Sequence, residues 1–83
     1  LATVEFDLQG KIQRANEIFL QNMGYAWEEI AGKHHSIFVA DSYAKSYDYV
    51  VFWDKLRKGI AQTDEFKRYT KEGKEVWFQA TYT

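Results

Sequence analysis

Residues 16–33 read NEIFLQNMGYAWEEIAGK, and this stretch decides the fold class. Asn16 is a good helix N-cap, because its side-chain oxygen accepts a hydrogen bond from an orphan backbone N–H. Apolar residues follow it at helical spacing, and Gly24 stands where such a helix commonly ends. Residues 27–30 add one short helical turn, which stops at Gly32. The stretch therefore predicts a short amphipathic helix and a second, shorter one behind it.

A hairpin is predicted on the N-terminal side of this stretch. Val4, Phe6 and Leu8 alternate with polar residues, and a period of two with one apolar side indicates a half-buried strand. Gly10 supplies a turn that tolerates positive φ, and residues 11–15 return as a second strand. We expect the apolar side of the first strand to face the helices.

The longest helix is predicted on the C-terminal side, after an irregular segment over residues 33–39. Asp41 or Ser42 caps it, and it runs to about Lys58, where Gly59 ends it. Apolar side chains occupy two of its faces, so we expect it to be buried more than a surface helix is. They are Tyr43, Tyr47, Val50 and Val51 on one face and Tyr49, Phe52, Trp53 and Leu56 on the other.

Two further strands are predicted over residues 64–71 and 75–83, joined by a turn at residues 71–74. Strands at both ends with helices between them indicate an α+β fold, an antiparallel sheet with helices packed on one face. The expected core residues are Val4, Phe6, Leu8, Phe19, Met23, Phe52 and Leu56.

Composition excludes several classes of function. The 83 residues suffice for one domain, and aromatic residues make up 18% of them. The net charge is −1 without a basic cluster, which argues against nucleic-acid binding, and no cysteine is present for thiol or disulfide chemistry. Glu28 and Glu29 are adjacent and do not converge on one site, so we expect an ion pair there, with Lys71 or Arg68. We therefore predict no enzyme, with no catalytic residues and no metal ligands.

The motifs, taken together, resemble the PAS family over essentially the whole chain. The first half of the family pattern is matched by Asn16 and Phe19, by MGY at 23–25 and by EEIAGK at 28–33. The segments HHSIF at 34–38 and YVVFW at 49–53 look closest to PAS modules of bacterial chemoreceptors and aerotaxis transducers, which are methyl-accepting chemotaxis proteins. The second half is matched by FW, L and G at 52–59, F and R at 66–68, K and G at 71–73, and VW at 76–77.

The resemblance implies a sensory module of a bacterial signalling protein, working in the cytoplasm. Such a module senses a small ligand or a cofactor state and relays it by conformational change to signalling domains of the same protein. The alternative is a ligand-free module for protein–protein interaction through dimerisation. The family's final strand lies between the first and fourth strands. The expectation here is a single PAS domain over residues 1–83, truncated at the C-terminus before that strand.

The resemblance also implies that haem or flavin is the kind of cofactor to consider. Trp53 matches a Trp of flavin-binding aerotaxis modules, whereas Arg68 stands where those modules carry Asn and offers donors only. His34 and His35 are either a haem ligand or structural, loop-capping residues. We expect no tightly bound haem or flavin in this fragment. The candidate cofactor-binding residues are Trp53, His34, His35, Phe38, Arg68 and Trp77, and Phe66 and Tyr82 either line the same pocket or fill the core.

A missing central strand would leave two open sheet edges, at residues 3–8 and 75–83. Open edges recruit other chains, so we expect a homodimer through the sheet, with Trp77 near the contact. The competing outcome is a monomer whose edges close on each other. The longest apolar run, residues 49–53, is far too short to span a membrane, so we expect no membrane contact by this domain.

Overall fold

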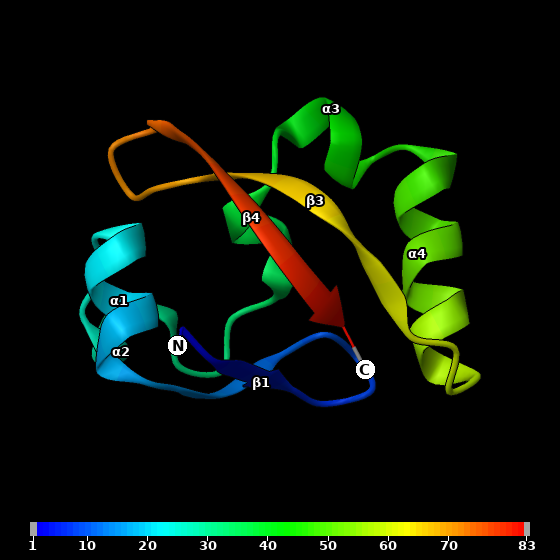
Figure 1. Ribbon diagram of the computed structural model, residues 1–83, viewed down its shortest axis with the longest axis horizontal. Helices are drawn as coiled ribbons and strands as arrows, with labels where there is room; N and C mark the ends of the chain where they lie inside the picture. Colours follow the sequence, from blue (N-terminus) through cyan, green and yellow to red (C-terminus); the bar gives the residue numbers. More distant parts are fainter. Residues whose placement is uncertain (1, 83) are drawn as a thin grey trace.

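The computed structural model describes residues 2–82 and has the α+β order that the sequence predicts (Figure 1). A pair of strands comes first, helical segments follow, and a second pair of strands comes last. Helices α1 and α2 lie at one end of the molecule and α4 at the other, with β3 and β4 between them. The elements are β1 (Val4–Phe6), β2 (Ile12–Ala15), α1 (Glu17–Met23), α2 (Trp27–Ile30), the 3₁₀ helix η1 (His35–Phe38), α3 (Asp41–Ala44), α4 (Tyr47–Arg57), β3 (Gln62–Tyr69) and β4 (Glu75–Tyr82).

Both strand pairs are antiparallel, as predicted. The strands β1 and β2 pair from Val4 opposite Ala15, and β3 and β4 pair along their whole length. In the part of the chain that the structure describes, these pairs form two separate two-stranded sheets. Strand β3 begins two residues earlier than predicted and ends at Tyr69, where a bond from the Thr70 N–H to the Lys74 carbonyl closes the turn to β4.

Helix α1 confirms the capping prediction. The Asn16 side-chain oxygen accepts from the backbone N–H of Phe19 at 3.0 Å and from that of Thr3 at 3.0 Å. Gly24 ends the helix with φ of 75°, in the left-handed region that favours glycine. Because Asn16 bonds to both Thr3 and Phe19, it connects the start of the first hairpin to α1. On this helix, Phe19 and Met23 are buried.

The prediction of one long helix over residues 41–58 was wrong, because the chain forms two helices there. The Ser46 hydroxyl accepts from the N–H of Tyr49 at 3.3 Å and caps α4, so the second helix begins at Tyr47. The expected burial of both faces was also wrong, since Tyr47 is 79% exposed. Helix α4 lies at one end of the molecule and packs against α3 and β3 (Figure 1).

Leu8 was predicted in the core but is 65% exposed. Strand β1 ends at Phe6, and the Asp7 carboxylate then accepts from the N–H groups of Gln9 and Lys11, both at 2.9 Å. These bonds turn the chain before Leu8 reaches the strand position that alternation assigned to it. The expected irregular segment after Lys33 also contains the helix η1.

The core consists of two clusters of buried side chains, and Phe6 packs against both. Of the other predicted core residues, Phe19, Met23 and Phe52 are buried, while Leu56 is half-buried against the second cluster. The first cluster comprises Ile12, Phe19, Met23, Ile30 and Phe38, and the second comprises Val39, Tyr49, Phe52 and Trp53.

Candidate functional site

A buried histidine stands where the two core clusters meet. The His35 Nδ1 lies 2.7 Å from the Tyr49 hydroxyl oxygen, and the two groups share a hydrogen bond. Side chains of β1, η1 and α4 surround the imidazole, and we call this group the His35 cluster. It comprises His35, Phe6, Phe38, Tyr49, Phe52 and Trp53, and the ring centroids lie 5.1 Å (Phe6) to 6.3 Å (Phe52) from that of His35.

The His35 imidazole is neutral in this environment. Burial lowers its pKa well below the ordinary value, and the charges of Arg68 and His34 lower it further. A neutral imidazole has one donor and one acceptor nitrogen, so its bond with Tyr49 fixes the orientation of both side chains.

Arg68 brings a permanent positive charge into the core. The side chain comes from β3, the residue is only 5% exposed, and its guanidinium carbon lies 5.0 Å from the Phe66 ring centroid. One guanidinium nitrogen donates to the Lys67 carbonyl oxygen at 2.8 Å. Because Phe66 packs on Phe52 at 5.8 Å, Arg68 adjoins the His35 cluster.

Trp53 contributes a buried hydrogen-bond donor. The residue is 6% exposed, and its indole N–H makes no hydrogen bond with any residue that the structure describes. A buried donor without an acceptor costs about 1–3 kcal/mol, so native structures contain few of them. Such a group is either a reservoir of strain or a contact that a ligand completes.

His34 has the loop-capping role that the sequence left open. Its Nδ1 accepts from the Ser36 N–H at 2.9 Å and so begins η1. Its Nε2 points at Gly10, where a Cβ atom would lie only 2.6 Å away. The ring also lies 5.8 Å from that of Trp53. Among the residues the structure describes, no group of histidines and carboxylates is arranged to hold a metal ion.

The structure therefore brings together most of the candidate cofactor-binding residues. Phe38, His34, His35 and Trp53 share ring contacts, and Arg68 adjoins them. Trp77 does not join them.

Trp77 is 60% exposed on the outer side of β4, and its indole nitrogen donates to Glu75 at 2.9 Å. Phe66 does pack against the second core cluster, as expected. The side chain of Tyr82 lies outside the described residues.

Three members of the cluster, Tyr49, Phe6 and Phe52, were not among the predicted site residues, although Phe6 and Phe52 were expected in the core. Tyr49 had a readable signal, because it precedes Trp53 by four residues and so lies on the same face of a helix. Phe6 had none, since alternation places it in the core without saying which helix it meets.

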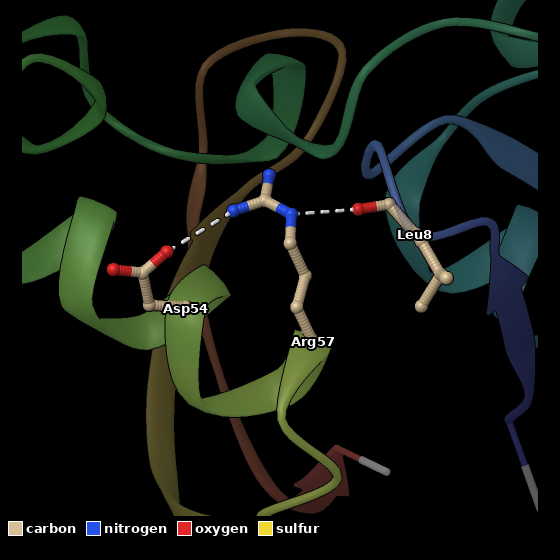
Figure 2. A network of polar contacts seen from close by, with 3 residues as sticks. All are labelled: Leu8, Asp54 and Arg57. Carbon is tan, nitrogen blue, oxygen red and sulfur yellow. Dashed lines mark hydrogen bonds and ion pairs between the residues drawn. The ribbon is translucent and has the colours of Figure 1, made fainter.

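A hydrogen bond closes the outside of the cluster between the first hairpin and α4 (Figure 2). The Arg57 Nε donates to the Leu8 carbonyl oxygen at 2.9 Å, and Arg57 Nη1 lies 3.5 Å from an Asp54 carboxylate oxygen. Leu8 follows Phe6 by two residues and Arg57 follows Trp53 by four. The bond therefore joins the same two segments whose rings meet inside, where Phe6 and Trp53 lie 5.8 Å apart.

A second polar connection ties α2 to the turn between β3 and β4. The Glu29 carboxylate accepts from the Ala26 N–H at 2.8 Å and pairs with the Lys71 ammonium, as the sequence predicted for this acidic pair. The bond to Lys71, and then that to Ala26, lower the pKa of Glu29, while Glu29 raises the pKa of Lys71. The Lys71 N–H also donates to the Met23 carbonyl at 2.9 Å. This turn is thus held at the end of α1.

Comparison with known families matches residues 12–83 to the family model described as the PAS fold. The biofilm dispersion protein BdlA of Pseudomonas aeruginosa is 46% identical over 82 residues, which is 99% of this chain and 20% of that protein. The aerotaxis receptor of Escherichia coli K12 is 31% identical over 74 residues, 89% of this chain and 14% of the receptor. The chain thus spans a fifth or less of the length of these curated relatives.

Solved structures with the same fold include blue-light photoreceptor domains. The light-state dimer of the fungal photoreceptor Vivid has a TM-score of 0.72 at 19% identity, covering 92% of this chain and 60% of Vivid. A light-oxygen-voltage domain studied with a flavin analogue has a TM-score of 0.64 at 25% identity, covering 81% of this chain and 49% of that one. No helix within residues 2–82 is long and apolar enough to cross a membrane.

Proposed function

The chain belongs to the PAS family, and we propose that it is the sensory module of a chemoreceptor-like bacterial protein, sensing a small molecule in the His35 cluster. Its similarity to an aerotaxis receptor supports a role in sensory signalling. The observation that carries the proposal is the buried Trp53 indole N–H without an acceptor among the described residues. A ligand that accepts from this donor adds a bond that the surrounding side chains do not supply.

The relay that we propose runs through the segments that the ligand touches. Trp53 is on α4 and Phe6 is on β1, so a molecule bound between their rings changes the separation of these elements. The hydrogen bond from Arg57 to the Leu8 carbonyl joins the same two segments at the protein surface, so such a change would lengthen or break it (Figure 2). We further propose that the domain works in the cytoplasm, passes its state to signalling domains of the same protein, and binds without catalysing a reaction.

Haem does not fit the two histidines. The His34 Nε2 faces the Gly10 backbone at close range, and its Nδ1 is held by the N–H of Ser36. His35 shares its Nδ1 with Tyr49 and is enclosed by aromatic rings.

A flavin would find a hydrogen-bond donor in the same part of the core. Trp53 is the side chain whose indole N–H would donate to an acceptor of the ring, and the buried Arg68 adjoins the same cluster. When bound, a flavin supplies a redox state that can be sensed. The expectation that the chain holds neither haem nor flavin tightly stays a prediction, and the visible absorption spectrum of the purified full-length protein tests it.

A thermal-shift screen of the full-length protein against small metabolites tests the proposed function. We expect at least one compound that raises the melting temperature of the unmodified protein and not of the Trp53→Phe variant. Trp77→Phe is the matched control, because Trp77 lies on the outer side of β4 and should leave that shift unchanged. A screen in which every active compound acts equally on both variants would contradict the proposal.

The second candidate function is a dimerisation module, and the exposed Trp77 favours it. Trp77 lies opposite Lys67 on the β3–β4 pair and is exposed, and tryptophan is enriched among the residues that dominate binding at protein interfaces. We propose a homodimer through this face. Trp77→Lys should then dissociate the dimer in sedimentation experiments, whereas Tyr47→Lys on α4, where Tyr47 is also exposed, should not. A monomer at high concentration would exclude this function.

A further inference from the structure

We propose that a polar pocket at the end of α1 binds a small α-amino acid in its zwitterionic form. The pocket has a volume of about 280 Å³ and lies between the last turn of α1 and the turn that joins β3 to β4 (Figure 1). We call it the α1 pocket, and it is lined by Gln21, Asn22, Gly24, Thr70, Glu72 and Lys74. These residues lie outside the His35 cluster, so the inference does not depend on the proposed function.

The two walls of the α1 pocket are fixed relative to each other. The Lys71 N–H donates to the Met23 carbonyl at 2.9 Å, and the Lys71 ammonium pairs with the Glu29 carboxylate. At the helix end, a Cβ atom added to Gly24 would meet nothing within 4 Å, so open space lies beside this residue. The pocket is therefore formed by contacts that need no ligand.

The polar side chains of the pocket are available for a ligand. Four of them form no hydrogen bond or ion pair with any residue that the structure describes, and these are Gln21, Asn22, Glu72 and Lys74. The Thr70 hydroxyl oxygen accepts from the Lys74 N–H at 3.1 Å and keeps its own proton to donate. The bond to Glu29 is the largest cause of the raised pKa of Lys71 and the charge of Glu72 is the smallest, so Lys71 does not engage Glu72.

The charges of the pocket select for a ligand that carries both signs. Only Gly73 separates Glu72 from Lys74 in the turn. A simple anion would pair with Lys74 and be repelled by Glu72, and a simple cation would meet the reverse. An α-amino acid carries an ammonium for Glu72 and a carboxylate for Lys74 on one carbon atom, and both bonds are of the stronger, charge-assisted kind.

The amides of the opposite wall favour a polar side chain on this amino acid. Gln21 and Asn22 each offer an acceptor oxygen and a donor nitrogen, so an amide on the ligand can donate and accept at the same time. A large apolar side chain would cover these groups without satisfying them. Because the charged side chains are exposed, each ion pair contributes little, and we expect a dissociation constant of about 1 mM or somewhat higher.

L-asparagine and two of its derivatives test this inference, because each derivative lacks one of the two charges. L-asparaginamide lacks the carboxylate, and N-acetyl-L-asparagine lacks the ammonium. Saturation-transfer NMR on the full-length protein measures ligands that bind in the millimolar range. L-asparagine should bind at least about threefold more tightly than either derivative, as the loss of one exposed ion pair implies.

Variants of the two charged residues test whether binding occurs in the α1 pocket. Lys74→Gln should remove the preference over L-asparaginamide, and Glu72→Gln should remove the preference over N-acetyl-L-asparagine. Both side chains are exposed, so the two variants should fold as the unmodified protein does. Lys58→Gln is the matched control, because Lys58 is an exposed lysine at the end of α4 and should leave all three affinities unchanged.

Several results would overturn the inference. The absence of a saturation signal from L-asparagine would do so, and so would equal affinities for the three compounds. Equal binding of L-asparagine to Lys74→Gln and Lys58→Gln would place the ligand elsewhere on the protein. Trp53→Phe should leave L-asparagine binding unchanged, so failure of this inference leaves the proposed function intact, and the metabolite screen tests that function separately.

Discussion

Replacing Gly10 by alanine tests how the hairpin turn is fitted to His34. Gly10 has φ of +82°, and a Cβ atom there would lie 2.6 Å from His34 Nε2 and 3.1 Å from Cδ2. The backbone cannot withdraw, because the Gly10 carbonyl accepts from the His35 N–H at 2.8 Å and the Gly10 N–H donates to Asp7 at 3.0 Å. The added methyl group must therefore displace the imidazole.

Two costs add in Gly10→Ala. The left-handed backbone costs an L-residue about 1–2 kcal/mol. Moving the imidazole breaks its bond to the Ser36 N–H, which contributes about 0.5–1.5 kcal/mol, and disturbs its packing on Trp53. We expect a total loss of about 2–4 kcal/mol in the free energy of unfolding, measured by urea titration followed by circular dichroism.

Gly73→Ala is the matched control for this substitution. Gly73 has φ of +83°, and a Cβ atom added there would meet nothing within 4 Å, so this variant carries the backbone cost alone. The difference between the two variants, about 1–2 kcal/mol, corresponds to about 5–15 °C in melting temperature for a domain of this size. In the background His34→Ala the excess cost of Gly10→Ala should vanish. Equal losses for Gly10→Ala and Gly73→Ala would refute the packing of His34 on Gly10.

Three further predictions concern the core and its charges. Phe38→Ala should lower the free energy of unfolding by about 3–5 kcal/mol, measured by urea titration, because the ring is buried; a loss below about 1 kcal/mol would contradict its core position. His35 binds a proton in the unfolded chain near pH 6.5 and in the folded chain only at lower pH. Stability should therefore fall as the pH drops below about 6.5, by up to about 1.4 kcal/mol per pH unit, and His35→Asn should flatten this slope in urea titrations between pH 7.5 and 5.5; an unchanged slope would mean that another group titrates. A double-mutant cycle of Glu29→Gln and Lys71→Met should show a favourable coupling at pH 7 that is lost as the pH falls through the lowered pKa of Glu29, and no coupling at pH 7 would show that the pair is not formed in solution.

Local signals in the sequence predicted most elements of the fold. Asn16 and Gly24 stand at the two ends of α1 as expected, because a capping residue acts within one helical turn. The break at Ser46 was also a local signal, since a serine that caps a helix is a common N-terminus, but the apolar pattern on both sides concealed it. The exposure of Leu8 follows from Asp7, whose side chain competes for the backbone N–H groups that a longer strand would use.

The site was less predictable, because contacts between segments far apart in the sequence decide which of two neighbouring residues is buried. Which of His34 and His35 is buried depends on a bridge between Lys11 and His34 and on the bond from the His35 N–H to the Gly10 carbonyl. Both connect segments more than twenty residues apart, beyond the reach of periodicity. Arg68 likewise lies between the exposed Lys67 and the half-buried Tyr69 on β3, and only the packing of its strand against α4 shows that its charge is buried.

These contacts give the turn of the first hairpin a part in the proposed relay. On one side the Gly10 carbonyl holds the N–H of His35, at the start of η1. On the other side the Leu8 carbonyl holds Arg57, near the end of α4. The turn therefore bridges the two helical segments that contribute His35 and Trp53 to the cluster. A ligand that changes the separation of those segments must strain or break one of the two bonds, and the exposed bond from Arg57 is the one that water can replace. In the proposed relay, ligand binding in the core would therefore first change a surface contact at the hairpin turn.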